Sequence, residues 1–225
     1  MLLSIIRQNQ KLAAKRNPAF DRNRFAKFLI YFMVAFWAAY LIFIGVMLSF
    51  AFEDIFPSME PYHIMNQGLI YLLILDFLLR FMLQPAMSQE IKPYLLMPIK
   101  KNKLVDTLLL QSGISSYNFF WFFLIVPFAL LTIIRFYGFT GILCYLCGIW
   151  LLMAMNSYWY LICKTLLNEK LLYILLPIGV YGLLAGTEFI PEGNPVSTFM
   201  MNLGEGFIQG NILAFLGVIA AILLL

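Results

Sequence analysis

The sequence predicts an all-α, polytopic integral membrane protein with about six transmembrane helices and a cytoplasmic N-terminus. Two observations lead to this prediction. Hydrophobic residues make up 63% of the 225 residues and charged residues only 12%, whereas a soluble domain is about half apolar and a quarter charged. The basic residues also gather in alternate connections between the apolar runs. A surface this apolar needs lipid as its solvent, and each bilayer span takes about 20 apolar residues.

Residues 1–27 are the only long polar-rich segment, and in them apolar side chains alternate loosely with lysine and arginine. Asn17-Pro18 interrupts this pattern. We interpret the segment as a basic, amphipathic cytoplasmic helix that lies at the membrane interface and leads into the first span. Residues 28–225 then form the transmembrane domain.

The apolar runs after residue 27 predict the spans in order. A short acidic loop separates the first two runs, and Gln84-Pro85 ends the second. Pro127 lies inside the third, which membrane helices tolerate when neighbouring groups satisfy the freed carbonyl. Tyr137-Gly138 predicts a tight turn, and an acidic, glycine-rich loop is expected over 191–206. The predicted spans are 28–52, 64–83, 114–134, 139–163, 171–190 and 207–225.

Orientation follows from the lysines and arginines, because loops rich in them stay in the cytoplasm. Of the 15 Lys and Arg, all but Arg80 and Arg135 lie in the N-terminal segment or in two later loops, 87–113 and 164–170. The loops after the first and fifth spans hold none and carry acidic residues instead. The N-terminus and the two basic loops are therefore predicted to be cytoplasmic, with 53–63 and 191–206 outside.

The chain lacks the sequence patterns of nucleotide-binding and catalytic sites. It has no GxxxxGK[ST] loop to hold phosphate, no HExxH and no GxSxG around a serine. His63 is the single histidine and is interpreted as a loop residue, and no cluster of convergent ligands suggests a metal site. Cys144 and Cys147 are interpreted as ordinary buried cysteines. We expect no enzyme activity, no cofactor and no nucleic-acid partner.

Asp76 and Arg80 are the only ionisable residues deep in a predicted span. They are four residues apart and so share one face of a helix. One interpretation is a pair that neutralises itself, with Arg80 close enough to the inner boundary to reach the headgroups. The other is a role in a transport path or in helix docking, because charges inside a membrane are costly. The sequence leaves both interpretations open.

Uncharged polar and aromatic residues also occur inside the third and fourth predicted spans. The polar ones are interpreted as hydrogen-bonding groups between helices, and they are Ser115, Ser116, Asn118, Asn156 and Ser157. The aromatic clusters at 119–123 and 158–160 are interpreted as interfacial or lipid-facing residues.

The loop 87–113 mixes apolar residues with lysines and carries two prolines. A fully solvated connector would not need the run Tyr94-Leu95-Leu96-Met97. The segment therefore either lies on anionic headgroups or contains a short cytoplasmic helix that docks on a partner protein. Residue chemistry alone does not separate these two interpretations.

The order of these parts resembles the membrane subunit of type-2 ABC exporters, in which the loop between the second and third spans is a coupling helix that contacts the ATPase. Residues 72–111 in particular resemble an uncharacterised family of bacterial membrane proteins grouped with those permeases. The matching elements are the D-x-x-x-R pair of Asp76 and Arg80, the turn Lys92-Pro93-Tyr94 and the step Pro98-Ile99-Lys100.

This resemblance implies a permease-like subunit of an ABC-type exporter in the bacterial inner membrane, energised by a separate cytoplasmic ATPase. It leaves a homo- or heterodimer open. The alternative is a non-transporting scaffold or assembly factor that recruits a cytoplasmic partner. Because family members are longer and the chain stops inside an apolar run, the natural protein is expected to continue past Leu225. The partner-docking residues would be Tyr94, Leu95, Leu96, Lys100, Lys101 and Lys103.

Overall fold

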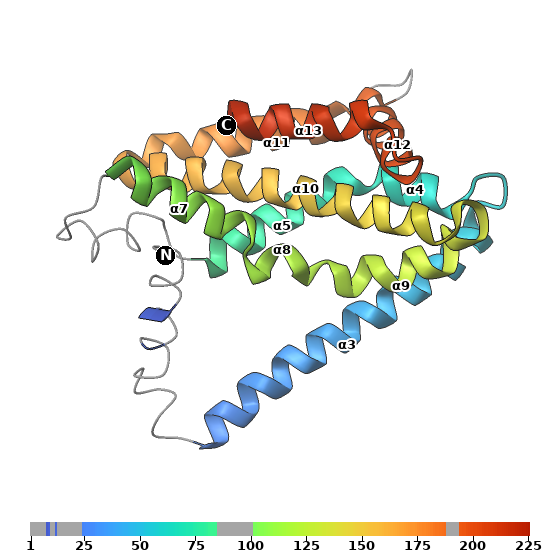
Figure 1. Cartoon of the computed structure of the whole chain (residues 1–225), viewed down its shortest axis with the longest axis horizontal. Helices are drawn as coiled ribbons and strands as arrows, with labels where there is room; N and C mark the ends of the chain where they lie inside the picture. The colour runs from blue at the N-terminus through green and yellow to red at the C-terminus, as the bar shows by residue number, and fades with distance from the viewer. Residues whose placement is uncertain (1–7, 10–11, 13–23, 85–100, 188–193) are drawn as a thin grey trace.

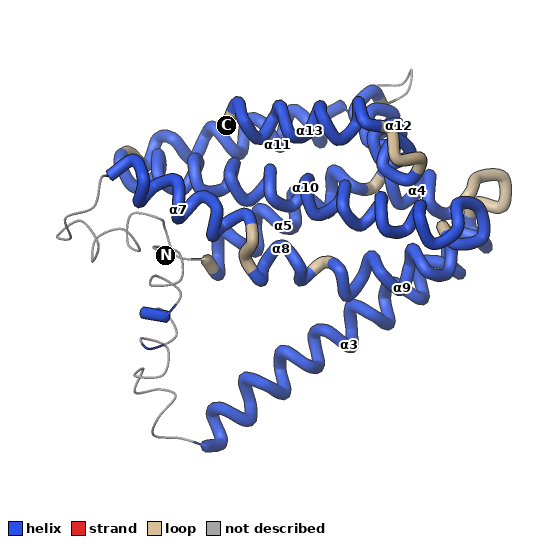
Figure 2. Tube along the Cα trace, in the orientation of Figure 1, coloured by secondary structure: helices blue, strands red, loops and turns tan. Residues whose placement is uncertain are grey.

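A computed structural model describes residues 8–9, 12, 24–84, 101–187 and 194–225. All regular structure in these ranges is helical, as Figure 2 shows, so the all-α prediction is confirmed. Most helices run along one common direction, and their connections gather at the two ends of the bundle (Figure 1).

Helix α3 (Arg24–Ile55) joins the bundle only through its C-terminal half, and its N-terminal half leans away from the other helices (Figure 1). Leu41, Ile44 and Leu48 pack against the core, mainly beside α9 (Phe122–Thr132). Gly45 lies so close to the backbone oxygen of Leu124 that an added Cβ would collide with it. A glycine is therefore needed where α3 and α9 approach, as in many packed membrane helices.

Helices α4 (Pro61–Gln67) and α5 (Leu69–Leu83) form one segment with a 48° bend between them. Pro61 occupies the first turn of α4, where its missing N–H removes no helical hydrogen bond. Because α4 begins at Pro61, the prediction that His63 lies in a loop was wrong. The bend near Gly68 separates the short α4 from the helix that carries the charge pair.

The third predicted span is broken. Helix α7 (Lys101–Gly113) and the short α8 (Ser116–Phe120) precede α9, with a bend of 62° at Trp121. Ser115 caps α8 by accepting a hydrogen bond from the Tyr117 backbone N–H. Pro127 lies inside α9 without ending it, as the sequence predicts.

Helix α10 (Ile134–Glu169) is the central helix and contacts most of the others. Its first turn is set off from the rest by Gly138, whose φ of 63° is a left-handed conformation that glycine adopts without strain. The turn predicted at Tyr137-Gly138 is thus present as a kink. Tyr145 and Ile149 on α10 are fully buried and form the core together with Phe128 of α9.

The C-terminal third differs most from the prediction. A 3₁₀ turn, η2 (Leu171–Ile174), and α11 (Leu175–Gly186) replace a full-length fifth span. The expected loop over 191–206 is largely helix α12 (Pro195–Ile208), which bends by 117° into α13 (Ile212–Leu224). The sixth span predicted over 207–225 is therefore not one straight helix.

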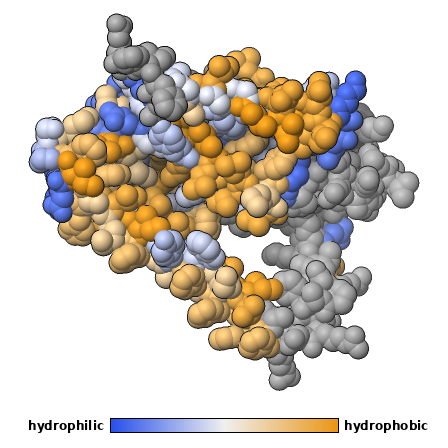
Figure 3. Space-filling view, turned by 180° about the vertical axis from the view of Figure 1, so that it is seen from behind, coloured by the Kyte–Doolittle hydropathy of each residue, from blue (hydrophilic) through white to orange (hydrophobic). Residues whose placement is uncertain are grey.

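Two helical stretches are long and apolar enough to cross a membrane, Lys27–Ile55 and Ile134–Glu169. Counting each bent pair as one span raises the number to five within the described residues, so six spans are not clearly present. On the face that Figure 3 shows, apolar side chains dominate the middle of the described surface, and the most polar ones lie toward its two ends. This distribution suggests membrane association.

Candidate functional site: a buried polar network

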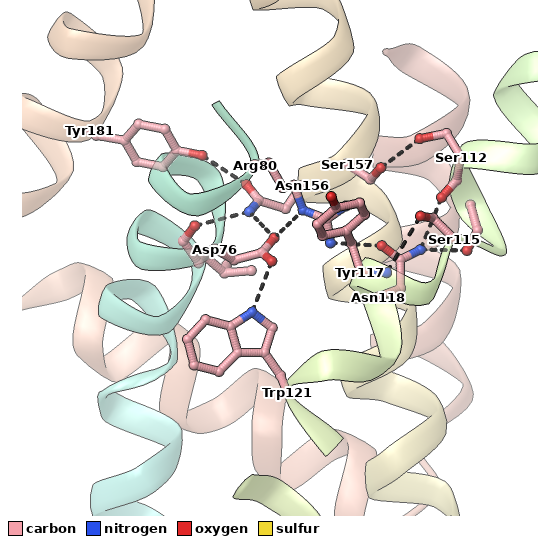
Figure 4. A network of polar contacts seen from close by, with 12 residues as sticks. Asp76, Arg80, Ser112, Ser115, Tyr117, Asn118, Trp121, Asn156, Ser157 and Tyr181 are labelled. Atoms are coloured by element: carbon pink, nitrogen blue, oxygen red, sulfur yellow. Dashed lines mark hydrogen bonds and ion pairs between the residues drawn. The ribbon is translucent and has the colours of Figure 1, made fainter. Parts of the chain in front are cut away.

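The charge pair predicted on α5 lies at the centre of a buried polar network (Figure 4). Arg80 Nε donates to Asp76 Oδ2 over 2.7 Å, as the spacing of four residues on a helix allows. Only 3% of Asp76 and 1% of Arg80 is exposed. Arg80 therefore points into the bundle, and the interpretation that it reaches the headgroups was wrong.

Two further side chains, each from a different part of the chain, hold the Asp76 carboxylate. Trp121 Nε1 donates to Asp76 Oδ1 over 2.8 Å, and Asn156 Nδ2 donates to Asp76 Oδ2 over 2.7 Å. Three donors thus converge on one carboxylate, which compensates for much of its lost hydration. Trp121 marks the bend before α9 and Asn156 lies on α10, so Asp76 fixes three elements together.

Arg80 connects the pair to the end of α7. Its Nη2 donates to Asn118 Oδ1 over 2.7 Å. The Asn118 amide group in turn donates to the backbone oxygens of Ser112, over 3.2 Å, and Gly113, over 2.5 Å. These are carbonyls of the last turn of α7, which have no partner within an ideal helix. One amide side chain therefore joins the ion pair to α7.

A second connection between α7 and α10 reinforces the first. The hydroxyl groups of Ser112 and Ser157 lie 2.7 Å apart and share a hydrogen bond. Tyr181 of α11 reaches the same region, where its hydroxyl donates to Asn156 Oδ1 over 2.8 Å. Asn156 also donates to the backbone oxygen of Leu73, over 2.9 Å. The network therefore joins α5, α7, α8, α10 and α11, with Trp121 at the α8–α9 bend (Figure 4).

The network is electrically neutral as a unit because it contains one carboxylate and one guanidinium group. Such a pair needs good geometry and additional hydrogen bonds to offset its desolvation. The one group left over is Arg80 Nη1, which is buried and has no hydrogen-bond partner in the described part of the chain. The arrangement suits a rigid joint between helices, because three donors from three different elements hold one buried carboxylate.

Smaller polar contacts stabilise the packing of α10 beside the α4–α5 segment at both of its ends. At one end, the Lys164 ammonium group donates to the backbone oxygens of Phe81 and Gln84, each over 2.8 Å. Tyr160 donates its hydroxyl to the oxygen of Gln84 as well. Tyr160 is fully buried, so its interpretation as an interfacial or lipid-facing residue was wrong.

At the other end, α12 packs against α4. His63 and Glu205 face each other with 2.5 Å between Nδ1 and Oε1. The Asn66 side chain packs so close to Gly204 that a Cβ at position 204 would collide with it. The Tyr145 hydroxyl donates to Asn66 Oδ1 over 2.9 Å. Sequence reasoning did not identify this contact between helices.

The structure brings together only part of the predicted site. Asn118, Asn156 and Ser157 hydrogen-bond between helices, as predicted. In the aromatic cluster 119–123, Trp121 is buried and belongs to the network. Of the docking loop, the described part begins at Lys101, the first residue of α7, and Lys103 is exposed. Tyr94, Leu95, Leu96 and Lys100 lie outside the described residues.

In the described ranges, no group of three or more His, Cys, Asp or Glu side chains could hold a metal ion.

Comparison with known proteins identifies the family of the chain. No curated protein and no solved structure matches the chain. A family model matches residues 10–225, which is nearly the whole chain, and the chain therefore belongs to DUF5687, a family of unknown function.

Proposed function

We propose that the chain is a multi-pass protein of the bacterial cytoplasmic membrane with its N-terminus in the cytoplasm. Two contacts support this topology because each joins connections predicted to lie on one side. Arg135 donates to Glu53 over 2.7 Å, which joins the two predicted outer connections. Lys164 binds the end of α5, which joins two predicted cytoplasmic ends.

This topology predicts opposite labelling of single cysteines placed at Ser58 and Asn102. The three native cysteines, which are free in the structure, are first replaced. In intact cells an impermeant thiol reagent should label position 58, whereas position 102 should react only after permeabilisation. Labelling of position 102 from outside would overturn the proposed map.

Within this membrane arrangement, the function that the geometry supports best is that of a permease-like subunit of an ABC-type exporter, energised by a separate ATPase. The observation that carries the proposal is the connection of α7 to the buried charge pair through Asn118. A segment that receives force from an ATPase needs a stiff path into the membrane-embedded helices. A chain of buried, hydrogen-bonded polar groups forms such a path, because moving one member breaks bonds that water does not replace.

The exposed face of α7 supports the same proposal. Lys103 and Asp106 are exposed, whereas Leu104 is buried at 2% exposure against the bundle. One face of the helix is thus held by the bundle, and the other carries charges that can steer a soluble partner. The run from Tyr94 to Leu96 would supply the apolar anchors of that interface.

Photocrosslinking from position 95 tests the docking, in membranes that contain a candidate ATPase encoded beside the gene. We expect a specific product with the ATPase that disappears in Tyr94→Ala, because a few large side chains carry most interface energy. A matched Asp106→Asn variant should keep the product, since an exposed charge mainly affects the association rate. Crosslinking to lipid only, for every ATPase tried, would contradict the coupling role.

Transport in reconstituted vesicles separates the exporter from a scaffold. When it is reconstituted with the ATPase that it crosslinks to, an exporter subunit should support nucleotide-dependent movement of substrate across the vesicle membrane. A partner that crosslinks in the absence of any nucleotide-dependent transport would favour the scaffold or assembly factor.

A further inference from the structure

A pocket of about 300 Å³ opens at the end of the bundle where α3 stops and α10 begins. Its lining residues come from the end of α3, the connection to α4, and the junction between α9 and α10. The pocket is remote in the fold from the buried network and shares no residue with it. The proposed topology places this end outside the cell.

The charges that line the pocket do not cancel. Glu53 forms an ion pair with Arg135, whose Nη1 lies 2.7 Å from Glu53 Oε1. Glu60 precedes α4 as its N-cap residue, but its carboxylate makes no capping hydrogen bond. Within the described residues no basic side chain pairs with Glu60, because the ion pairs there involve other carboxylates. The lining therefore carries one uncompensated negative charge.

The remaining wall is mixed: Ser58 and Thr132 are polar, and the other lining residues are two phenylalanines, two prolines and Met59. Phe56 and Phe136 both line the pocket, and their side chains remain 46% and 52% exposed. Aromatic side chains that line a pocket together with a carboxylate suit an organic cation, because a ring attracts the cation while the carboxylate supplies its counter-charge. A small anion would meet the opposite field, and a bare metal ion would lack convergent ligands, since the described residues hold no such cluster.

We propose that this pocket binds an organic monocation: an ammonium group, quaternary or alkylated, attached to a compact apolar body. Glu60 supplies the charge, and Phe56 and Phe136 supply the surface for the apolar part. The pair of Glu53 and Arg135 forms part of the wall and lowers the pocket's negative charge. The ammonium group can belong to a free solute or to a lipid headgroup, and the proposal does not depend on the exporter function.

The test measures binding of phenyltrimethylammonium to the purified full chain in detergent by calorimetry, with benzenesulfonate as an aromatic anion of similar size. Glu60→Gln should weaken binding of the cation about fivefold or more, because it removes the uncompensated charge. Arg135→Gln should strengthen binding, because it frees the second carboxylate. Asp54→Asn is the matched control: it removes an exposed charge next to the pocket but outside its lining, and it should change affinity by less than about twofold.

Opposite effects of the first two variants, with little effect of the third, would establish the site. Displacement of the probe by a short-chain phosphatidylcholine would assign it to lipid headgroups, and lack of displacement to free cations. The proposal is overturned if the cation does not bind saturably, if benzenesulfonate binds equally well, or if Glu60→Gln and Asp54→Asn behave alike. Asp54 and Arg135 are exposed and Glu60 is half-buried, so we expect these variants to fold, and the melting temperature checks this.

Discussion

Replacing Arg80 with leucine should destabilise the protein by about 3–5 kcal/mol, because the change leaves the Asp76 carboxylate buried without its countercharge. The carboxylate would keep only the donors on Trp121 and Asn156, at 3% exposure. Asp76→Asn should have a comparable cost, since it leaves the guanidinium group uncompensated. Membrane yield and melting temperature of the purified variants measure the effect.

The double variant Asp76→Asn with Arg80→Leu should recover part of the loss, because two neutral side chains cost less than one unpaired buried charge. The protein also offers a matched control. Arg135 and Glu53 form an ion pair with the same 2.7 Å separation, but their side chains are 56% and 39% exposed. Arg135→Leu should therefore cost less than about 1 kcal/mol. Equal stability of the Arg80→Leu and Arg135→Leu variants would remove the burial argument.

The local part of this site was predictable and the long-range part was not. The spacing of Asp76 and Arg80 indicates a shared helix face, and the polar character of Asn118 and Asn156 in apolar runs indicates bonding between helices. Trp121 gave no such signal, because a tryptophan in an aromatic cluster is as typical of the membrane interface as of a buried donor. The choice of which helices contact one another depends on side-chain packing in three dimensions. The spacing of residues along the chain does not specify that packing.

The C-terminal segment shows how composition can mislead. Glycine, proline and acidic residues over 191–206 indicate a loop, yet helix α12 begins at Pro195. The missed signal was Asn194-Pro195: the Asn194 side chain accepts from the N–H groups of Val196 and Ser197, and Pro195 fits the first turn. Gly204 then serves packing against Asn66 rather than flexibility. A cap signal deserved more weight than glycine content.

Replacing Asn118 with leucine should uncouple α7 from the charge pair, and it should cost about 2–4 kcal/mol. The change removes the acceptor of Arg80 Nη2, beside an Nη1 that already has no partner in the described part of the chain. It also removes the donors to the oxygens of Ser112 and Gly113. Hydrogen exchange should therefore accelerate in the last turn of α7, which keeps the hydroxyl bond between Ser112 and Ser157 and its backbone bonds but loses its connection to the charge pair.

Ser115→Ala serves as the control because it lies in the same segment but removes only a long contact, 3.4 Å, to the Tyr117 N–H. It should cost about 0.5 kcal/mol and leave exchange in α7 unchanged. If α7 transmits force as proposed, Asn118→Leu should keep the crosslink from position 95 to the ATPase but lose nucleotide-dependent transport. In this proposal docking depends on Tyr94, Leu95 and Leu96, whereas transmission depends on the buried bonds. Transport at the normal rate in Asn118→Leu, with α7 loosened, would show that force does not pass through this network.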